Sequence, residues 1–228
     1  MPTQMKTEVI EFDGWTLRVR PAQSPNPKLL LMIHGLTGDE NSMWVFARRF
    51  LPDYWIIAPR APYPADPQGF SWRPNPMTVE QAQLNLHKRP KLDSLLPSAA
   101  ALMKLLDEYT ASVKIEAQQF DAIGFSQGGA MVNILGLVYP QRIRKMGVLA
   151  GFVPAGMDAY IQDRALTGKR IFVAHGTQDE MVPVDSARAS MELLEQAGAS
   201  ITYCEDEVGH KLSGDCLRAL ENYLSADG

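Results

Sequence analysis

The stretch FDAIGFSQGGAMVNILGLVY, residues 120–139, passes directly from a short apolar run into a longer segment that is apolar almost all round. The short run is typical of a buried strand, and the longer segment of a helix near the centre of the molecule. At the junction, Gly124 and Gly128 flank Ser126 in the pattern Gly-x-Ser-x-Gly. A strand, a glycine-rich turn and a buried helix in succession favour an α/β fold.

Further short apolar runs resemble this strand, and helical periods lie between them. The runs are LLLMIHG at 29–35, WIIAPR at 55–60, KMGVLAGF at 145–152, RIFVAHG at 170–176 and ITYCE at 201–205. Runs that are apolar on both faces are typical of parallel strands covered by helices on both sides. Apolar residues that recur every three or four positions over 95–113 and 217–224 predict two of these helices, the second capped by Ser213.

Near the start of the chain, the runs EVIEF and WTLRV are joined by Asp13-Gly14. Such a link between β-rich runs predicts an antiparallel hairpin. With 228 residues, 46% of them apolar, the chain is long enough to build a single core. We therefore expect one α/β domain over 1–228, with a mostly parallel central sheet, an N-terminal antiparallel hairpin and helices on both faces.

One segment, residues 61–93, interrupts the alternation of strands and helices. It holds six of the 16 prolines together with Tyr63, Phe70 and Trp72. Connections of this length are usually functional or disordered, and the aromatic side chains argue against disorder. The segment therefore predicts an ordered flap or rim.

Composition and charge exclude two classes of partner. The 22 basic and 26 acidic residues leave a net charge of −4, and no Lys- or Arg-rich run could follow a phosphate backbone. We therefore expect no nucleic-acid partner. The chain shows neither a signal-like start nor an apolar stretch of about 18 residues. We expect no stable membrane insertion and a cytoplasmic location.

Two cysteines, Cys204 and Cys216, complete the composition. Two residues make no disulfide framework, and their spacing fits no zinc pattern. Because cytoplasmic thiols are kept reduced, we expect two unpaired structural cysteines. A single bridge stays an alternative, since the two residues flank one loop.

The turn at Ser126 has two interpretations. Between a buried strand and a helix, Gly-x-Ser-x-Gly is typical of a nucleophile elbow, in which flanking glycines let strand and helix approach closely. A glycine-rich turn can also cradle phosphate. However, GFSQGG lacks the Gly-Lys-Ser/Thr of a phosphate loop, and the next strand does not end in the acidic residue of a dinucleotide site. We expect a nucleophile.

A serine nucleophile needs a base, and the base needs an orienting acid. After such an elbow the partners follow in the order acid, then histidine, each in a loop behind a strand. TQDEMVP offers Asp179 after the run at 170–176, and His210 follows the run at 201–205. Glu180 and Asp185 are the rival acids, and Asp185 is more typical of a helix cap.

The other histidines have a simpler interpretation. His34 and His175 each end a strand just before a glycine, and His87 lies in the proline-rich segment. We expect all three to be polar residues satisfied by nearby backbone. Only His210 lies beyond the candidate acid in a loop behind a strand.

Acyl transfer also requires donors for an oxyanion. One is expected to be the backbone N–H of Gln127, the residue after the nucleophile, and the other to come from a loop behind an early strand. HGLTGDE, residues 34–40, supplies that loop. We assign the second donor to Leu36, with Thr37 as the alternative.

In this order, HGLTGDE, PRAPYP, GFSQGGAM, HGTQDEMVP and GH resemble the phospholipase/carboxylesterase family of α/β-hydrolases. That family includes acyl-protein thioesterases and small bacterial carboxylesterases. The resemblance spans residues 34–210 and implies an α/β-hydrolase fold. It implies Ser126, Asp179 and His210 as the triad, and it leaves a homodimer open.

From these motifs we expect a serine carboxylesterase that acts through an acyl-enzyme on short- to medium-chain esters. No metal or organic cofactor is expected, and the partner is a small-molecule ester. Phe70, Trp72 and Met181 are the expected substrate contacts. A thioesterase or lysophospholipase of the same fold is the alternative, and a non-catalytic binding protein on this scaffold is the third candidate.

Overall fold

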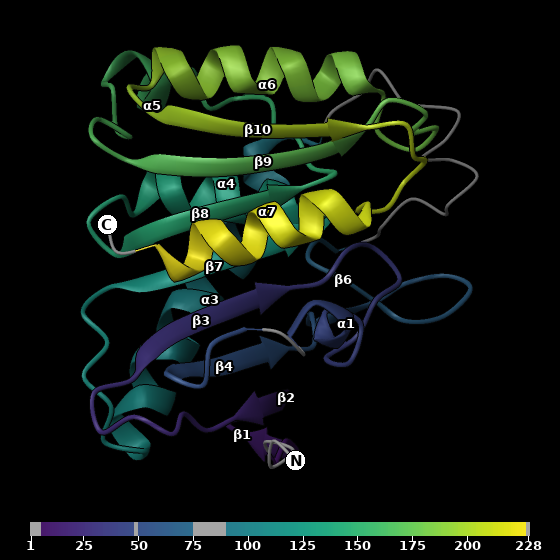
Figure 1. The fold of residues 1–228 in the computed structure, drawn as a ribbon. Coiled ribbons are helices and arrows are strands. Elements are labelled where there is room, and N and C mark those ends of the chain that lie inside the picture. The colour runs from purple at the N-terminus through teal and green to yellow at the C-terminus, as the bar shows by residue number, and fades with distance from the viewer. Residues whose placement is uncertain (1–5, 48–49, 75–89, 227–228) are drawn as a thin grey trace.

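The computed structural model describes residues 6–47, 50–74 and 90–226. Its centre is an eight-stranded sheet with the strand order β1-β2-β4-β3-β7-β8-β9-β10 (Figure 1). The strands are β1 (Glu8–Phe12), β2 (Trp15–Arg20), β3 (Lys28–Ile33), β4 (Tyr54–Pro59), β7 (Phe120–Phe125), β8 (Ile143–Leu149), β9 (Arg170–Gly176) and β10 (Ser200–Asp206). All the apolar runs identified in the sequence are therefore strands of one sheet.

Pairing within this sheet matches the expected mixture of directions. β1 pairs with β2 and β2 with β4 in antiparallel fashion, and every pair from β4 through β3 to β10 is parallel. At the hairpin, Asp13 and Gly14 have φ of 45° and 78°, the left-handed values that a tight two-residue turn requires. The predicted N-terminal hairpin is confirmed.

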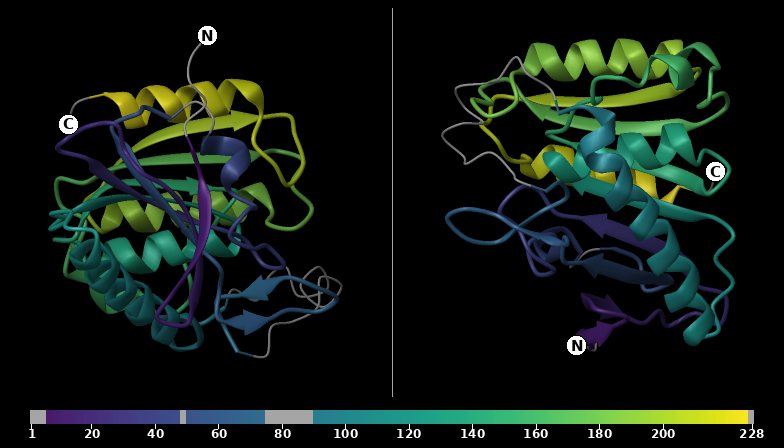
Figure 2. Two further views of the ribbon diagram at one scale, coloured as in Figure 1. Left: turned by 90° about the horizontal axis from the view of Figure 1, so that it is seen from below. Right: turned by 180° about the vertical axis from the view of Figure 1, so that it is seen from behind.

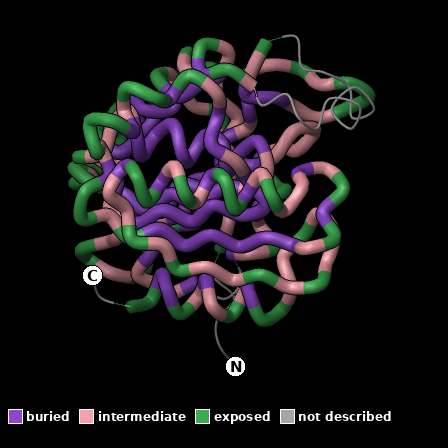
Figure 3. The backbone as a smooth tube through the Cα atoms, turned by 90° about the horizontal axis from the view of Figure 1, so that it is seen from above, coloured by how far each residue is buried: buried purple, intermediate pink, exposed green. Residues whose placement is uncertain are grey.

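Helices cover both faces of the sheet, as Figures 1 and 2 show. They are α1 (Trp44–Ala47), α3 (Leu92–Ser112), α4 (Gln127–Val138), α5 (Asp158–Gln162), α6 (Val184–Gln196) and α7 (Gly214–Ser225). One apolar layer joins the sheet to α3, α4, α5 and α6, and a second joins its other face to α1 and α7. The inner strands β3, β4, β7, β8 and β9 and helix α4 hold most of the buried centre, which is purple in Figure 3.

Helix α4 matches the buried helix predicted from residues 120–139. All its residues from Gln127 to Leu137 are buried. Helix α7 begins as expected, because the Ser213 hydroxyl accepts a hydrogen bond from the Cys216 N–H at 3.1 Å. Helix α6 begins differently: its cap is Pro183, and Asp185 lies exposed in the first turn rather than capping the helix.

The expected flap is described only in its first and last parts. Residues 63–71 fold into a small antiparallel pair, β5 (Tyr63–Pro64) and β6 (Phe70–Ser71), that lies beside the main sheet (Figure 2, left). Helix α3 begins at Leu92, at the end of the expected segment. Residues 75–89, and with them His87, lie outside the described residues.

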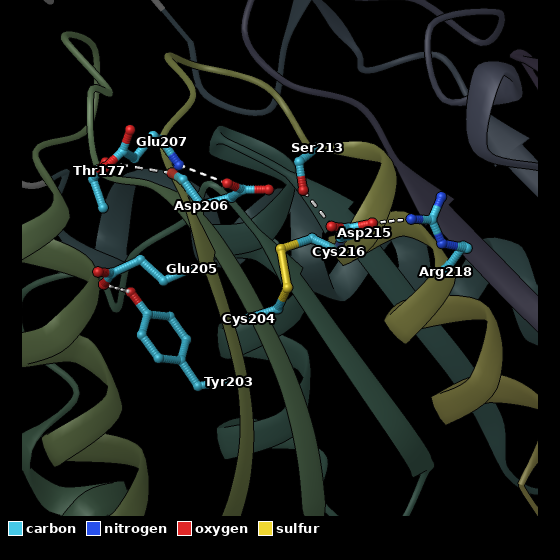
Figure 4. The surroundings of a disulfide bond; sticks show 10 residues. All are labelled: Thr177, Tyr203, Cys204, Glu205, Asp206, Glu207, Ser213, Asp215, Cys216 and Arg218. Atoms are coloured by element: carbon cyan, nitrogen blue, oxygen red, sulfur yellow. Dashed lines mark hydrogen bonds and ion pairs between the residues drawn. A yellow bond between two sulfur atoms is a disulfide. The ribbon is translucent and has the colours of Figure 1, made fainter.

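The expectation of two unpaired cysteines is wrong. Cys204 in β10 and Cys216 in α7 form a disulfide with an S–S distance of 2.04 Å (Figure 4). Their Cα atoms are 5.6 Å apart because the first turn of α7 packs against the end of β10. The bond closes the loop between the strand and the helix, and that loop carries His210.

No helix among the described residues is long and apolar enough to cross a membrane.

Candidate active site

The parallel strands bring the predicted motifs to one edge of the sheet. β3, β7, β9 and β10 run in the same direction, so the segments that follow them gather at their carboxyl ends (Figure 1). These segments contain Leu36, Ser126, Asp179 and His210. Ligands of open α/β sheets bind at this edge.

Ser126 forms a sharp turn between β7 and α4. Its φ of 54° and ψ of −115° are rare for a residue with a side chain, and its N–H donates to Leu149 O at 2.8 Å. A Cβ on Gly124 would lie 2.1 Å from Gly128 O, and a Cβ on Gly128 would lie 2.0 Å from Ile33 O. Only glycine at both positions lets strand and helix come this close, which is the geometry of a nucleophile elbow.

Asp179 and His210 are joined directly. His210 Nδ1 lies 2.7 Å from Asp179 Oδ2, and Asp179 Oδ1 accepts hydrogen bonds from the N–H groups of Met181 and Val182, both at 2.8 Å. Burial on its own would raise the pKa of Asp179. The hydrogen bonds from His210, Val182 and Met181, with the charge on His210, outweigh that effect and hold the pKa below its usual value. The carboxylate is thus ionised at neutral pH and oriented on three sides.

His210 lies beside the elbow as well as beside the acid. Its ring centroid is 4.8 Å from that of Phe125, the residue that precedes Ser126. Within the described residues, no hydrogen bond joins the Ser126 hydroxyl to the imidazole. The structure therefore brings the predicted acid and base into contact, and the base packs against the residue that precedes the predicted nucleophile.

The rival residues have other contacts. His34 Nε2 accepts the Ala61 N–H at 3.0 Å and its Nδ1 lies 2.7 Å from Gly35 O, so the imidazole is the neutral Nδ1–H form. Burial, despite that backbone hydrogen bond, lowers the pKa of His34 to about 4. His175 Nε2 lies 2.8 Å from Val182 O, and burial lowers its pKa too. His34 is thus satisfied by backbone, as predicted, whereas His175 is satisfied only at Nε2, because its buried Nδ1 has no hydrogen-bond partner among the described residues.

The rival acids do not approach His210. Glu180 is exposed, and Asp185 is exposed and 3.3 Å from Arg188 Nη1. Of the three carboxylates considered, only Asp179 is buried, with 6% of its surface exposed.

The loop after β3 lies against the elbow. A Cβ on Gly35 would lie 3.3 Å from Ser126 Cβ. The Thr37 N–H donates to Phe70 O at 3.0 Å, so it is already engaged. Among the described residues, the backbone N–H groups of Leu36 and Gln127 have no acceptor. Leu36 is therefore the better of the two loop residues for the second oxyanion donor.

The three expected substrate contacts differ in burial. Trp72 is fully buried, and its Nε1 donates to His34 O at 2.8 Å. This ring therefore packs against the loop after β3 and does not form an exposed wall of a substrate pocket. Phe70 is partly exposed, and Arg60 lies over its ring at 4.8 Å from the centroid. Met181 is also partly exposed. Phe70 and Met181 as substrate contacts stay predictions.

Sequence reasoning missed one part of the site, the Gln127 side chain. It is buried and bonds to Ser71 and Trp72, residues that lie far away in the chain. No local sequence pattern predicts a contact between residues so far apart in the chain. Within the described part of the chain, no group of three or more His, Cys, Asp or Glu residues could hold a metal ion.

Comparison with known proteins identifies a family. Residues 16–227 match the family model described as Phospholipase/Carboxylesterase. A protein named "Probable carboxylesterase SOBER1-like" from Arabidopsis thaliana is 25% identical over 92% of this chain and 82% of its own. An "Acyl-protein thioesterase 1" from Eremothecium gossypii is 26% identical over 92% of both chains.

Solved structures show the same fold. A carboxylesterase from Mesorhizobium loti superposes with a TM-score of 0.80 over 97% of this chain and 99% of its own, at 22% identity. At that identity the likeness shows the fold alone, whereas the family match covers nearly the whole chain. From its α/β-hydrolase fold, its strained serine turn and its matching family model, the chain belongs to the phospholipase/carboxylesterase family of hydrolases.

Proposed function

We propose that this chain is a serine carboxylesterase that hydrolyses short- to medium-chain esters through an acyl-enzyme. The observation that carries the proposal is the 2.7 Å contact between His210 Nδ1 and Asp179 Oδ2 next to the Ser126 turn. With Nδ1–H donating to the carboxylate, Nε2 is left free to accept a proton. That arrangement suits general-base catalysis by His210.

In the acylation step, Ser126 Oγ attacks the ester carbonyl and His210 Nε2 accepts its proton. The negative charge that develops on the carbonyl oxygen is stabilised by the Leu36 and Gln127 N–H groups. The imidazolium then gives its proton to the leaving alkoxide, and the alcohol departs. In deacylation, His210 takes a proton from water, the hydroxide attacks the acyl-enzyme, and the carboxylic acid leaves as Ser126 regains its proton.

Asp179 has a supporting role in this scheme. Its carboxylate keeps His210 in the Nδ1–H tautomer and stabilises the imidazolium when the proton arrives. The two backbone donors at Oδ1 fix the carboxylate so that Oδ2 faces the imidazole.

Labelling of the protein with a fluorophosphonate tests the proposal. We expect one adduct, located on Ser126 by peptide mass mapping, and none on folded Ser126→Ala. The variant should also lose several orders of magnitude in kcat towards p-nitrophenyl acetate. Folded wild-type protein that takes no label would instead favour a non-catalytic binding protein on this scaffold.

The acyl-chain preference is tested separately. We expect kcat/KM for p-nitrophenyl esters to be highest between acetyl and medium-chain acids, because Phe70, not the buried Trp72, is the aromatic side chain left to contact a chain. A maximum at the palmitoyl ester would contradict this preference.

A thioesterase is the second candidate, favoured by the relative named acyl-protein thioesterase. Paired oxygen esters and thioesters of the same acid distinguish the two, since faster turnover of palmitoyl thioester would favour the thioesterase.

A small-molecule ester as the partner and a homodimer stay predictions.

The cytoplasm stays the prediction for localisation, and the state of the disulfide in the cell tests it. Cytosolic disulfides are rare and usually transient. Thiol alkylation before cell lysis reports whether Cys204 and Cys216 are bridged in the cell.

A further inference from the structure

Gln127 links the elbow to the segment at β6. As the first residue of α4 it follows Ser126 directly, yet its side chain points to a different part of the chain. Its Oε1 accepts the Trp72 N–H at 2.9 Å and lies 3.4 Å from the Ser71 hydroxyl, while Nε2 donates to that hydroxyl at 3.2 Å. Both ends of the buried amide are therefore used.

The same segment is bonded to the loop that contains Leu36. Phe70 O accepts the Thr37 N–H at 3.0 Å, and the Phe70 N–H donates to Gly38 O at 2.9 Å. The Trp72 indole donates to His34 O at 2.8 Å. Residues 34–38 are thus held at both ends by residues 70–72, with Leu36 between the two attachments.

Gly69 permits this close contact. It has a φ of +82°, and a Cβ there would lie 2.0 Å from Thr37 O. The backbone of the flap therefore lies directly against the backbone of the loop. No side chain intervenes that could absorb a movement of one relative to the other.

Two oxyanion donors on different elements must keep a fixed separation, because stabilisation of a developing charge depends on donor positions to within a few tenths of an ångström. Here one donor opens α4 and the other lies in the loop after β3. Hydrogen bonds from the Gln127 amide to residues 71 and 72, and from residues 70 and 72 to residues 34–38, connect these two elements through the flap.

We propose that the Gln127 side chain is a positioning residue that holds the Leu36 N–H in place relative to the N–H of Gln127 itself. This inference rests on the proposed function and adds a role for a side chain whose backbone alone is required by that mechanism. Since the oxyanion exists only in the transition state and the intermediate, loss of the amide lowers kcat and leaves KM almost unchanged.

The first test compares Gln127→Met with Gln119→Met. Methionine keeps the length of glutamine and removes both hydrogen-bonding groups. Gln119 is an exposed glutamine directly before the first residue of β7, and among the described residues its amide donates only to Gln141 O. We expect about a 10- to 100-fold loss of kcat for Gln127→Met, with KM within about threefold, and no change for Gln119→Met.

A second readout separates positioning from general loosening. A trifluoromethyl ketone forms a tetrahedral adduct with an oxyanion, whereas the product carboxylic acid does not. For Gln127→Met we expect affinity for the ketone to fall in parallel with kcat and affinity for the acid to stay at the wild-type level. Equal losses for both would overturn the inference.

Trp72→Phe keeps a large ring and removes only the indole donor to His34, so it remains a test if Gln127→Met does not fold. We expect it to lower kcat in the same manner. If both variants act through one set of bonds, the double variant loses no more kcat than the more damaging single variant. Losses that multiply would overturn the inference.

These outcomes are distinguishable from failure of the proposed function. A folded Gln127→Met with wild-type kcat, in a protein whose Ser126 is labelled by the fluorophosphonate, contradicts only the positioning role. A wild-type protein that is not labelled contradicts the esterase itself.

Discussion

The Oδ2 atom of Asp179 lies 2.7 Å from His210 Nδ1 and 3.4 Å from His175 Nε2, so one carboxylate oxygen faces two imidazoles. His175 donates to Val182 O, at 2.8 Å, and its ring is fully buried. His210 has no comparable backbone partner among the described residues, and its ring is partly exposed. The carboxylate therefore orients His210, and His175 packs beneath it.

Replacement of this carboxylate tests the pairing. Asp179→Asn keeps the shape of the side chain, but its amide can donate to Nδ1 and favour the wrong tautomer of His210. We expect kcat to fall by about 10⁴ with little change in KM. Exposed Asp185→Asn serves as the matched control and should keep wild-type kcat. If both variants lost activity, or if both kept it, the result would point to a different acid.

Stability is expected to fall in mild acid because of His34. Burial lowers its pKa from 6.5 to about 4, so between these values the unfolded chain binds a proton that the folded chain does not. Stability therefore decreases as the pH falls from 6.5 to 4, by about 3 kcal/mol for the whole shift. Urea unfolding at several pH values measures this loss.

The comparison variant is His34→Gln, which removes the titrating group. Its stability is expected to be lower than that of the wild type at pH 7 but to change less steeply down to pH 4. Every other titratable group is present in both proteins, so the difference in slope isolates His34. Parallel curves for the two proteins would show that His34 is not the group responsible.

The disulfide is expected to support the loop of His210. Removal of Cys204–Cys216, by a dithiol reductant or as the double alanine variant, should cost about 3 kcal/mol of unfolding free energy. It should also lower kcat several-fold, since the ends of the loop are then free to separate. Unfolding in denaturant and ester hydrolysis, each with and without reductant, measure the two effects.

The double alanine variant also controls for the reductant, because the chain contains no other cysteine. Reductant should leave its stability and its kcat unchanged. A further loss on reduction would place the effect outside the disulfide.

Substitution of a glycine in the elbow is expected to cost more stability and activity than substitution of a glycine elsewhere. In Gly128→Ala the new methyl group would lie 2.0 Å from Ile33 O, so β3 and α4 must separate. We expect a loss of stability of about 1–3 kcal/mol or more, together with most of the activity. Gly214→Ala, where the nearest atom is Arg218 Nη1 at 3.6 Å, should be neutral or slightly stabilising. Circular dichroism melts and ester hydrolysis measure both variants.

Much of the fold could be predicted because its signals are local. The turn at Asp13-Gly14 and the apolar runs of the parallel strands are readable within a few residues, and so is the passage from β7 through Ser126 into α4. Ser126, Asp179 and His210 could be selected from their order behind successive strands, and they could be expected to lie close together because strand ends of a parallel sheet meet at one edge.

Other features depend on contacts between distant residues. The bridge between Cys204 and Cys216 required α7 to pack against β10, which the spacing of the two cysteines does not reveal. Trp72 looked suited to a pocket wall because it is aromatic and lies in a flap, but its indole found an acceptor at His34 O and became buried. Burial of such a residue is decided by the whole fold, and so is the role of the Gln127 amide.

The Cys204–Cys216 bond turns the chain between them into a covalent ring that contains His210. A protease that cuts once inside this ring releases no fragment, because the disulfide still joins the two pieces. The mass of the protein rises only by that of the one water molecule used in hydrolysis. The ring therefore offers a place where the backbone can be opened, or a short peptide inserted, while α7 stays attached to β10. On a denaturing gel such a nicked molecule would separate into two chains only after reduction.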